Sequence, residues 1–160
     1  MSDATEDDFG AALGILLRSY SGMVGPRLVD FPHGARGYET LCEVLQGSPP
    51  SQAALAAKLG IDRTMMTYLI DDLVEAGLVE RRPNPADRRQ RRIVATAAGR
   101  AAVASLCGRV AEAQDAVLAA LDPAERAVFR SLLSKAAGTT VVHTEETCQI
   151  VTEALESRSG

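Results

Sequence analysis

Six arginines and one aspartate are concentrated in twelve residues of this chain, the run RRPNPADRRQRR at positions 81–92. The run carries a formal charge of +5, whereas the whole chain of 160 residues carries −4, so the remaining residues sum to −9. Guanidinium groups bind phosphate and carboxylate oxygens through several N–H donors held in a fixed plane. The run therefore predicts a local binding surface for a polyanion, and the acidic remainder would keep other surfaces away from phosphates.

The residues before this run have the pattern of two short helices joined by a tight turn. Ser51 is a predicted N-cap for a helix over residues 52–59, and Gly60 suits the left-handed position that ends it. Asp62 is a predicted cap for a second helix over residues 63–76. Helix, glycine-containing turn and helix in this order predict a helix-turn-helix.

The second of these helices has an apolar side and a polar side. Its apolar residues recur at spacings of three and four and are predicted to face the core: Met66, Leu69, Ile70 and Leu73. The residues left on the outer side are Arg63, Thr64, Met65, Thr67, Tyr68 and Asp71. This outer side is the part of the helix that could meet a ligand.

The arginine run itself is predicted to lie on a β-hairpin. Residues 78–82 and 91–95 are β-compatible, and they flank residues 83–90, which are rich in proline, asparagine and aspartate. A tip of this length exceeds what a structural hairpin needs and is typical of a functional loop. Because Asp71 would repel a polyanion unless it were paired, we expect it to bridge to an arginine of this hairpin.

Helical periodicity covers most of the remaining chain and makes the fold class mainly α with a small β-hairpin. The predicted helices span residues 8–31, with Gly25-Pro26 as a candidate kink, 35–46, 97–121, a segment that starts at Pro123, and 144–155. Thr96 and Asp122 are the predicted N-caps of the third and fourth of these.

Two motifs in this arrangement resemble the MarR family of bacterial transcription regulators. That family has an Asn-Pro-x-Asp-x-Arg wing tip and a Thr-x-x-Gly sequence that opens a long helix; residues 84–89 and 96–99 match these patterns. Residues 51–81 are also similar to the two DNA-binding helices of the family, and the resemblance spans roughly residues 8–138. Tyr68 stands where many members have a basic residue and Ala95 replaces a usual leucine, so base preference is not carried over.

The resemblance implies a winged helix-turn-helix with N- and C-terminal helices that form a homodimer. It divides the chain into an N-terminal dimerisation helix (1–34), a DNA-binding domain (35–95), C-terminal dimerisation helices (96–138) and a helical extension (139–160). The implied function is repression at a palindromic operator, relieved by a small, possibly aromatic ligand. Apolar residues beyond the needs of one thin helical layer fit a dimer: Leu16, Leu17, Val24, Val128, Phe129, Leu132, Ile150 and Val151.

The DNA contacts divide by the part of the duplex that each residue would meet. Ser51 and Arg63 are expected at phosphates, and Arg89 in the minor groove with Asp87 orienting it, as the resemblance implies. The alternative for Asp87 is a plain turn-forming role. The full set of candidates is Ser51, Arg63, Thr64, Met65, Thr67, Tyr68, Asp87, Arg88, Arg89 and Arg91.

Several sensing models stay open at this stage. A ligand pocket would be lined by Tyr20, Met23, His33, Tyr38 and Cys42, for which ordinary core packing is the alternative. The three cysteines, Cys42, Cys107 and Cys148, have no CxxC spacing and are predicted to be reduced thiols, which makes a redox-responsive regulator the second model. A zinc-responsive regulator is the third, supported only by the spacing of His143 and Cys148.

Two further classes of function are weighed against a regulator. An enzyme is not expected, because no catalytic constellation is visible, and neither a metal nor a cofactor is predicted. A protein-interaction module that has lost DNA binding is the remaining alternative, although both residues of the wing tip are kept. No apolar run approaches the ~20 residues of a membrane span and the N-terminus is acidic, so we expect a cytoplasmic protein without membrane contact.

Overall fold

The computed structural model describes residues 8–46, 49–138, 148, 149, 151 and 153 of the chain. The first half contains α1 (Phe9–Val24), the 3-10 helix η1 (Gly25–Leu28), α2 (Gly34–Val44), α3 (Gln52–Leu59) and α4 (Arg63–Glu75). The second half contains β1 (Val79–Pro83), β2 (Arg91–Ala95), α5 (Ala97–Val117) and α6 (Pro123–Ala136). These elements confirm the mainly α fold class with a single β-hairpin in the described ranges.

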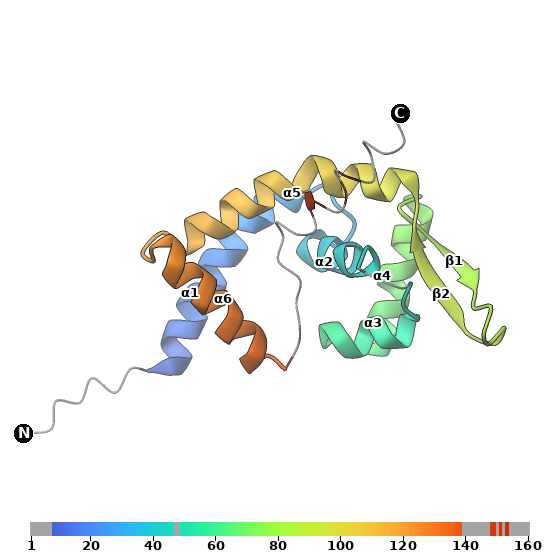
Figure 1. Cartoon of the computed structure of the whole chain (residues 1–160), viewed down its shortest axis with the longest axis horizontal. Helices are drawn as coiled ribbons and strands as arrows, with labels where there is room; N and C mark the ends of the chain where they lie inside the picture. The colour runs from blue at the N-terminus through green and yellow to red at the C-terminus, as the bar shows by residue number, and fades with distance from the viewer. Residues whose placement is uncertain (1–7, 47–48, 139–147, 150, 152, 154–160) are drawn as a thin grey trace, which may run out of the picture.

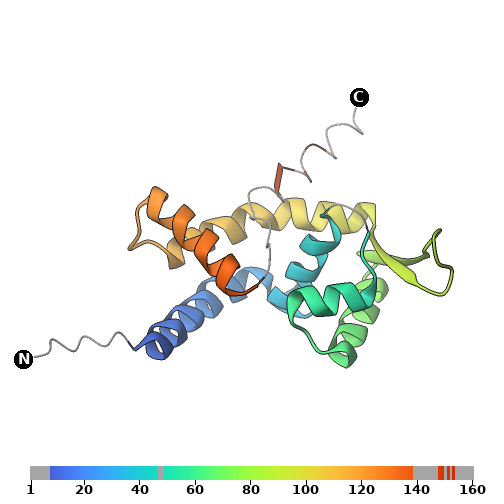
Figure 2. The ribbon, with the colours of Figure 1, turned by 60° about the horizontal axis from the view of Figure 1, so that its bottom comes forward.

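The long helix α5 connects two different ends of the molecule (Figure 1). At one end lie α2, α3, α4 and the hairpin, which projects away from the helices. At the other end lie α1 and α6, and the view of Figure 2 shows the same separation. Because α5 touches the hairpin at its start and α1 along its length, it is the element that fixes the two ends relative to each other.

One hydrophobic core runs from α1 through the helix-turn-helix to the hairpin and α5. The four residues of α4 predicted to face inward, Met66, Leu69, Ile70 and Leu73, are each 0% exposed, which confirms the helical pattern. On the hairpin, Ile93 is fully buried as well. Since the core crosses the proposed boundaries at residues 34 and 95, the division into domains stays a prediction.

The Thr-x-x-Gly sequence joins the start of α5 to the turn between α4 and β1. The Thr96 hydroxyl accepts from the Gly99 amide at 3.0 Å and donates to the Gly77 carbonyl at 2.5 Å. A Cβ at Gly99 would lie 2.1 Å from the Leu78 carbonyl oxygen, a distance that no side chain tolerates. The glycine is therefore required by close approach of α5 to the backbone that leads into the hairpin.

Helix α6 is held to α5 by polar contacts and not by burial. Asp122 caps α6 as expected and forms a capping box with Glu125, and the Arg130 guanidinium lies 2.6 Å from Asp115 of α5. The Arg126 Nε donates to the Leu118 and Leu121 carbonyls in the turn between α5 and α6. All residues of α6 are described and none of them is buried.

Three sequence-based expectations about the helices and cysteines need correction. The first helix ends at Val24, before Pro26, which has no N–H to continue it, and α5 ends at Val117 instead of residue 121. Cys107 and Cys148 form a disulfide, so only Cys42 is free and the prediction of three reduced thiols is wrong. The pairing joins residues 41 positions apart, a contact that spacing along the sequence does not reveal.

The last predicted helix, 144–155, lies partly outside the described residues. Within it, residues 148, 149, 151 and 153 are helical. None of the helices that the structure describes is long and apolar enough to cross a membrane. In the same described ranges, no three His, Cys, Asp or Glu side chains gather as they would to hold a metal ion.

Candidate nucleic-acid interface

Helix α4 presents a polar side to solvent because its apolar side is fully used in the core. Asp62 caps the helix, with its Oδ1 accepting from the Thr64 and Met65 amides at 2.9 and 3.3 Å. The predicted outer residues are all exposed: Arg63, Thr64, Met65, Thr67 and Tyr68. Tyr68 is 61% exposed although it is large and aromatic, which is unusual for a side chain without a partner.

A chain of side-chain contacts fixes α4 against α3 and the hairpin. The Thr67 hydroxyl accepts from the Gln52 amide at 2.7 Å, and the Gln52 Oε1 accepts from Arg81 at 3.3 Å. Arg81 also donates to Asp71 at 2.6 Å. The expected bridge between Asp71 and an arginine of the hairpin is therefore confirmed. The negative charge of Asp71 is balanced by the guanidinium group of Arg81.

Gln52 is the residue of this surface that the sequence did not indicate, and Arg81 was expected only as an unspecified arginine of the hairpin. Gln52 is the first residue of α3, and Arg81 lies on the first strand, 29 positions later. Only the fold brings them together, although one signal was available: an unpaired acid at Asp71 required a nearby cation. The hydroxyl of Thr67 is occupied within the protein, because it accepts from Gln52 and donates to the Arg63 carbonyl at 3.0 Å.

The two strands of the hairpin are anchored to the start of α3. They pair antiparallel with Arg82 opposite Arg92 and Pro83 opposite Arg91. The Ile93 amide donates to the Pro50 carbonyl at 2.8 Å, and Ser51 forms an isolated bridge with Arg92. Like charges opposite each other destabilise a hairpin, so the facing arginines indicate a surface arranged for binding more than for stability.

Ser51 already has a structural task at this junction. Its hydroxyl oxygen caps α3 by accepting from the Ala54 amide at 3.1 Å. Because a hydroxyl can accept and donate at once, the proton of Ser51 is still able to reach a phosphate. Its role as a phosphate contact remains a prediction.

The hairpin tip is a closed turn held by its own polar side chains. The Asn84 Oδ1 accepts from the Ala86 amide and the Asp87 Oδ1 accepts from the Arg89 amide, each at 3.0 Å. The Asn84 amide donates to the Gln90 carbonyl at 3.0 Å, which closes the loop. Asp87 therefore holds the backbone of Arg89 and not its guanidinium group, which fits the turn-forming interpretation. Its part in orienting Arg89 at DNA stays a prediction.

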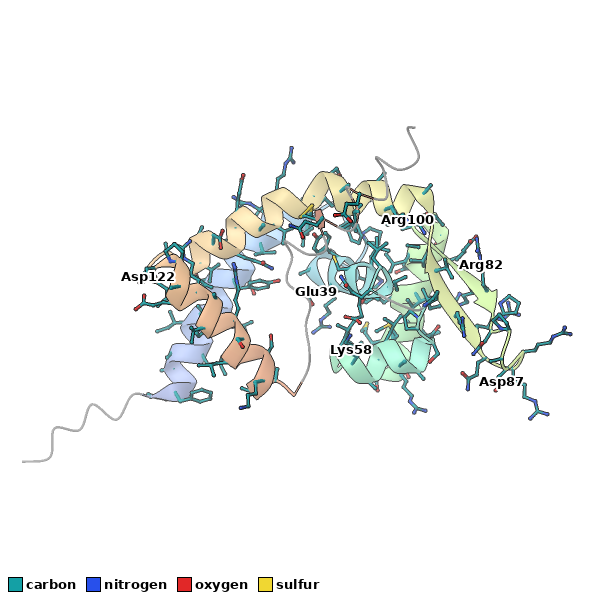
Figure 3. The ribbon with its side chains drawn as sticks, viewed as in Figure 1. Glu39, Lys58, Arg82, Asp87, Arg100 and Asp122 are labelled. Carbon is teal, nitrogen blue, oxygen red and sulfur yellow. A yellow bond between two sulfur atoms is a disulfide. The ribbon has the colours of Figure 1, made fainter. Side chains whose placement is uncertain are left out.

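Most of the charge at the tip is unpaired. Arg81 and Arg82 lie against Asp71 and Glu80, respectively. Among the described residues, no carboxylate lies within ion-pair distance of Arg88, Arg89 or Arg91, and all three are exposed. Figure 3 shows Asp87 at the tip and Asp122 at the opposite end of the molecule, so this unpaired positive charge is far from the acidic turn between α5 and α6.

Comparisons with known proteins agree with this geometry. The model of the MarR family matches residues 36–90, which run from α2 through the hairpin tip. A crystal structure of a MarR-family transcriptional regulator from Rhodococcus sp. RHA1 is 31% identical with a TM-score of 0.74, covering 88% of this chain and 100% of that one. The chain belongs to the MarR family. Its fold is the winged helix-turn-helix of these transcriptional regulators, and the hairpin is the wing.

Two further solved structures with this fold concern proteins that bind or respond to small molecules. CouR from Rhodococcus jostii RHA1, bound to p-coumaroyl-CoA, is 32% identical with a TM-score of 0.73, covering 89% of this chain and 100% of that one. BpsR from Bordetella bronchiseptica, whose DNA binding is regulated by 6-hydroxynicotinic acid, has a TM-score of 0.74 at 21% identity and covers 88% of this chain and 100% of its own. At that identity BpsR shows the shared fold alone.

Three of the five candidate ligand residues of this MarR-family chain lie together between α1 and α2. The Tyr20 hydroxyl donates to Glu39 at 3.1 Å, and Tyr38 packs edge-on against Phe31 with ring centroids 5.9 Å apart. The Tyr38 hydroxyl, next to the Cys42 thiol, is buried and makes no hydrogen bond of ordinary geometry within the described residues. A buried hydroxyl without a partner is rare in folded proteins.

The surroundings of this cluster favour uncharged side chains. Desolvation by the neighbouring helices raises the pKa of Glu39, although part of its side chain reaches solvent. Burial raises the pKa of both Tyr20 and Tyr38 above their usual range. Burial also raises the pKa of the Cys42 thiol to about 12, so this cysteine stays protonated at neutral pH.

The other two candidates are placed differently. His33 has a left-handed backbone (φ 60°) just before α2, and its Nε2 lies 2.5 Å from the Asp72 carboxylate on α4. Met23 is 38% exposed near the end of α1, where its carbonyl accepts from Arg27 at 2.6 Å. His33 thus connects the segment between α1 and α2 directly to the helix whose outer side is the candidate DNA surface.

Proposed function

We propose that the chain represses transcription by binding a palindromic operator as a homodimer, through α4 and the wing. The observation that carries the proposal is the set of unpaired arginines on a fixed wing tip, Arg88, Arg89 and Arg91, beside an exposed α4. Phosphates bound by such groups release condensed counterions, which drives association with a duplex even for an acidic protein. The contact chain from Thr67 to Asp71 supports the proposal because it presets the position of the wing relative to α4.

The dimensions and side chains of α4 suit the major groove. Its 13 residues extend about 20 Å, and the groove admits one such helix. Thr64, Met65 and Tyr68 would meet base edges, and the Thr67 methyl group would contact a thymine methyl. Arg89 at the tip would enter the adjacent minor groove, where narrow A·T-rich segments concentrate negative potential.

A second copy of the chain is the proposed partner of the α1 and α6 end. Both helices carry apolar stripes at a spacing of four: Phe9, Leu13 and Leu17 on α1, and Val128 and Leu132 on α6. Phe9 is 76% exposed and Leu132 59% exposed, which is costly unless another surface covers them. Val24 and Val151, counted in the apolar excess from sequence, are 1% exposed and belong to the core of the chain itself.

The proposed effector is a small aromatic molecule that binds at the cluster of Tyr20, Tyr38 and Cys42. CouR, which is 32% identical and was solved with p-coumaroyl-CoA, supports a ligand that carries an aromatic group. The Tyr38 hydroxyl, whose neighbour is the Cys42 thiol and which makes no hydrogen bond of ordinary geometry, would hydrogen-bond to it. The contact of His33 with Asp72 offers a direct route from this region to α4, so a ligand that moves the start of α2 would also move the DNA-contacting helix.

The test is a fluorescence-anisotropy titration on the DNA upstream of its own gene at several salt concentrations. We expect affinity to fall steeply with salt, and Arg89→Ala to weaken binding and reduce the salt slope by about one. Arg109→Ala is the matched control, because Arg109 is an exposed arginine on α5 outside the wing.

Either of two results would overturn the proposal. One is an equal loss of affinity in the Arg89 and Arg109 variants, because the wing would then have no special part. The other is the absence of binding at low salt, even to nonspecific duplex, in protein refolded from denaturant to remove any ligand. That second result would favour a protein-interaction module.

A further inference from the structure

We propose that Cys107 and Cys148 form a reversible thiol–disulfide modification site that anchors the C-terminal segment to α5. The chemical class of reactant is a small-molecule disulfide such as oxidised glutathione. Cys148 is the residue that it modifies first, and Cys107 is the residue that resolves the product. This inference does not depend on the chain binding DNA.

The two cysteines are positioned for this exchange by the fold. Their sulfurs are bonded in the structure, with Cα atoms 5.7 Å apart, within the range that a disulfide spans without movement of the backbone. Cys107 lies on the buried side of α5, between Val103 and Val110. Cys148 packs against the hydrophobic core that contains Val103, Cys107 and Val110 of α5.

Apolar contact keeps the pair together when the bond is broken. Val151, one helical turn after Cys148, is 1% exposed and belongs to the same core as Cys107. Because this contact does not require the disulfide, the reduced thiols stay at high effective concentration relative to each other. In the reduced state the Cys107 thiol can donate a hydrogen bond to the Ala104 carbonyl, which lies 3.6 Å from its sulfur.

The two members of the pair differ in access, which sets the order of reaction. Cys107 is 5% exposed, whereas Cys148 is only partly buried. An incoming disulfide of ordinary size therefore reaches Cys148 first. Cys42 does not compete, because the thiolate is the nucleophile and burial keeps this thiol protonated.

The exchange proceeds in two balanced steps. The Cys148 thiolate attacks one sulfur of oxidised glutathione, forms a mixed disulfide and releases one glutathione thiolate, which takes up a proton. The Cys107 thiol then loses its proton, attacks the Cys148 sulfur and forms the internal disulfide while the second glutathione leaves as a thiol. The two protein thiols are oxidised and one glutathione disulfide is reduced to two thiols; a small dithiol reverses the sequence.

The cross-link closes a loop that contains all of α6. The loop runs from Cys107 through the end of α5 and residues 123–136 to Cys148. Helix α6 has no buried residue and is held by the polar contacts of Arg126 and Arg130. Oxidation should therefore restrict the opening of α6, and reduction should loosen it.

The experiment incubates reduced full-length protein with oxidised glutathione and counts thiols by alkylation and intact mass. We expect the wild type to keep one alkylatable thiol, at Cys42, with a peptide that links Cys107 to Cys148. Cys107→Ser should trap glutathione on Cys148, whereas Cys148→Ser should carry no adduct at residue 107. Cys42→Ser is the matched control and should form the internal disulfide as the wild type does.

Each other outcome of the experiment has a defined meaning. Three alkylatable thiols, an adduct on Cys42, or disulfide-linked dimers through Cys148 would overturn the proposal, as would a disulfide that dithiothreitol does not reduce in the folded protein. Should the Cys107 variant not fold, as judged by circular dichroism, the Cys148 and Cys42 variants still decide whether the internal bond forms. Amide hydrogen exchange in α6 should be slower in the oxidised protein, and equal rates in the two states would overturn the anchoring role.

Discussion

The two ends of this molecule expose different kinds of surface. The wing end exposes unpaired positive charge, and the end formed by α1 and α6 exposes apolar side chains. At the wing end, most large apolar side chains of α4 are buried, Met65 and Tyr68 are exposed, and the wing tip adds the unpaired positive charge of Arg88, Arg89 and Arg91. At the other end, Asp122, Arg126 and Arg130 are paired by a cap and by contacts with the end of α5 and the turn after it, and the exposed surplus is apolar. The difference teaches that the first surface is complete without a protein partner and suits a polyanion, whereas the second is incomplete until another protein surface covers it.

The largest expected effect comes from placing charge on the apolar end. Leu17→Glu combined with Leu132→Glu should convert a dimer into a monomer at micromolar concentration, because both exposed leucines would carry carboxylates into the interface. The wing end should stay folded, since neither residue belongs to the core. Light scattering and circular dichroism measure the two effects.

The control for this pair is Val29→Glu. Val29 is 75% exposed but lies after η1, outside both stripes. It should leave the molecular mass unchanged. Dimers that survive the double substitution, or monomers produced by the control, would contradict the assignment of the second surface.

A smaller effect is expected where α5 joins the two ends. Gly99→Ala should destabilise the fold by about 2–3 kcal/mol, because its Cβ would lie 2.1 Å from the Leu78 carbonyl oxygen and the backbone would have to move. Gly108→Ala on the same helix meets nothing within 4 Å and should stabilise the fold by about 1 kcal/mol. Urea denaturation measures both changes in the free energy of unfolding. Changes of the same sign in the two variants would show that Gly99 is not tightly packed against Leu78.

The Asp71 bridge tests whether the wing end is held in place before DNA arrives. Asp71→Ala should cost about 0.5–1 kcal/mol of stability, since the bridge is partly exposed. It should also weaken DNA binding, because Arg81 loses the partner that fixes it against α4 and keeps only its longer contact with Gln52. Glu80→Ala removes the other bridge of the wing, to Arg82, without touching α4, and should change affinity less. Unchanged stability and affinity in the Asp71 variant would show that the bridge does not position the wing for DNA binding.

The sequence allowed the local elements and the character of the wing to be predicted, because both depend on neighbouring residues. The bounds of α3 and the second wing strand, the caps at Ser51 and Asp122, and the inward side of α4 all follow from spacing and capping chemistry. The contact chain through Gln52 and Arg81 and the disulfide could not be predicted this way. These contacts join residues 29 and 41 positions apart, and only tertiary packing decides which distant side chains meet.

The smallest expected effect is a change in the pH dependence of stability at the Tyr20 cluster. Because desolvation raises the pKa of Glu39 in the folded state, the protonated form favours folding. Its contribution is present in full below the pKa of the unfolded chain, about 4.3, and is lost as the pH rises through the folded value. Glu39→Gln removes this titration, so the stability of the variant relative to wild type should increase from acidic to neutral pH.

Tyr20→Phe distinguishes this explanation from a general effect of the substitution. The hydrogen bond from Tyr20 lowers the pKa of Glu39, so removing the hydroxyl should raise that pKa further. The pH window over which stability is lost should then move upward, whereas in Glu39→Gln it should disappear. Thermal denaturation across this pH range measures both shifts, and parallel profiles for all three proteins would show that Glu39 is solvated like a surface carboxylate. In that case the cluster between α1 and α2 would lack the low polarity that an aromatic ligand requires, and Tyr20, Tyr38 and Cys42 would not form the ligand site.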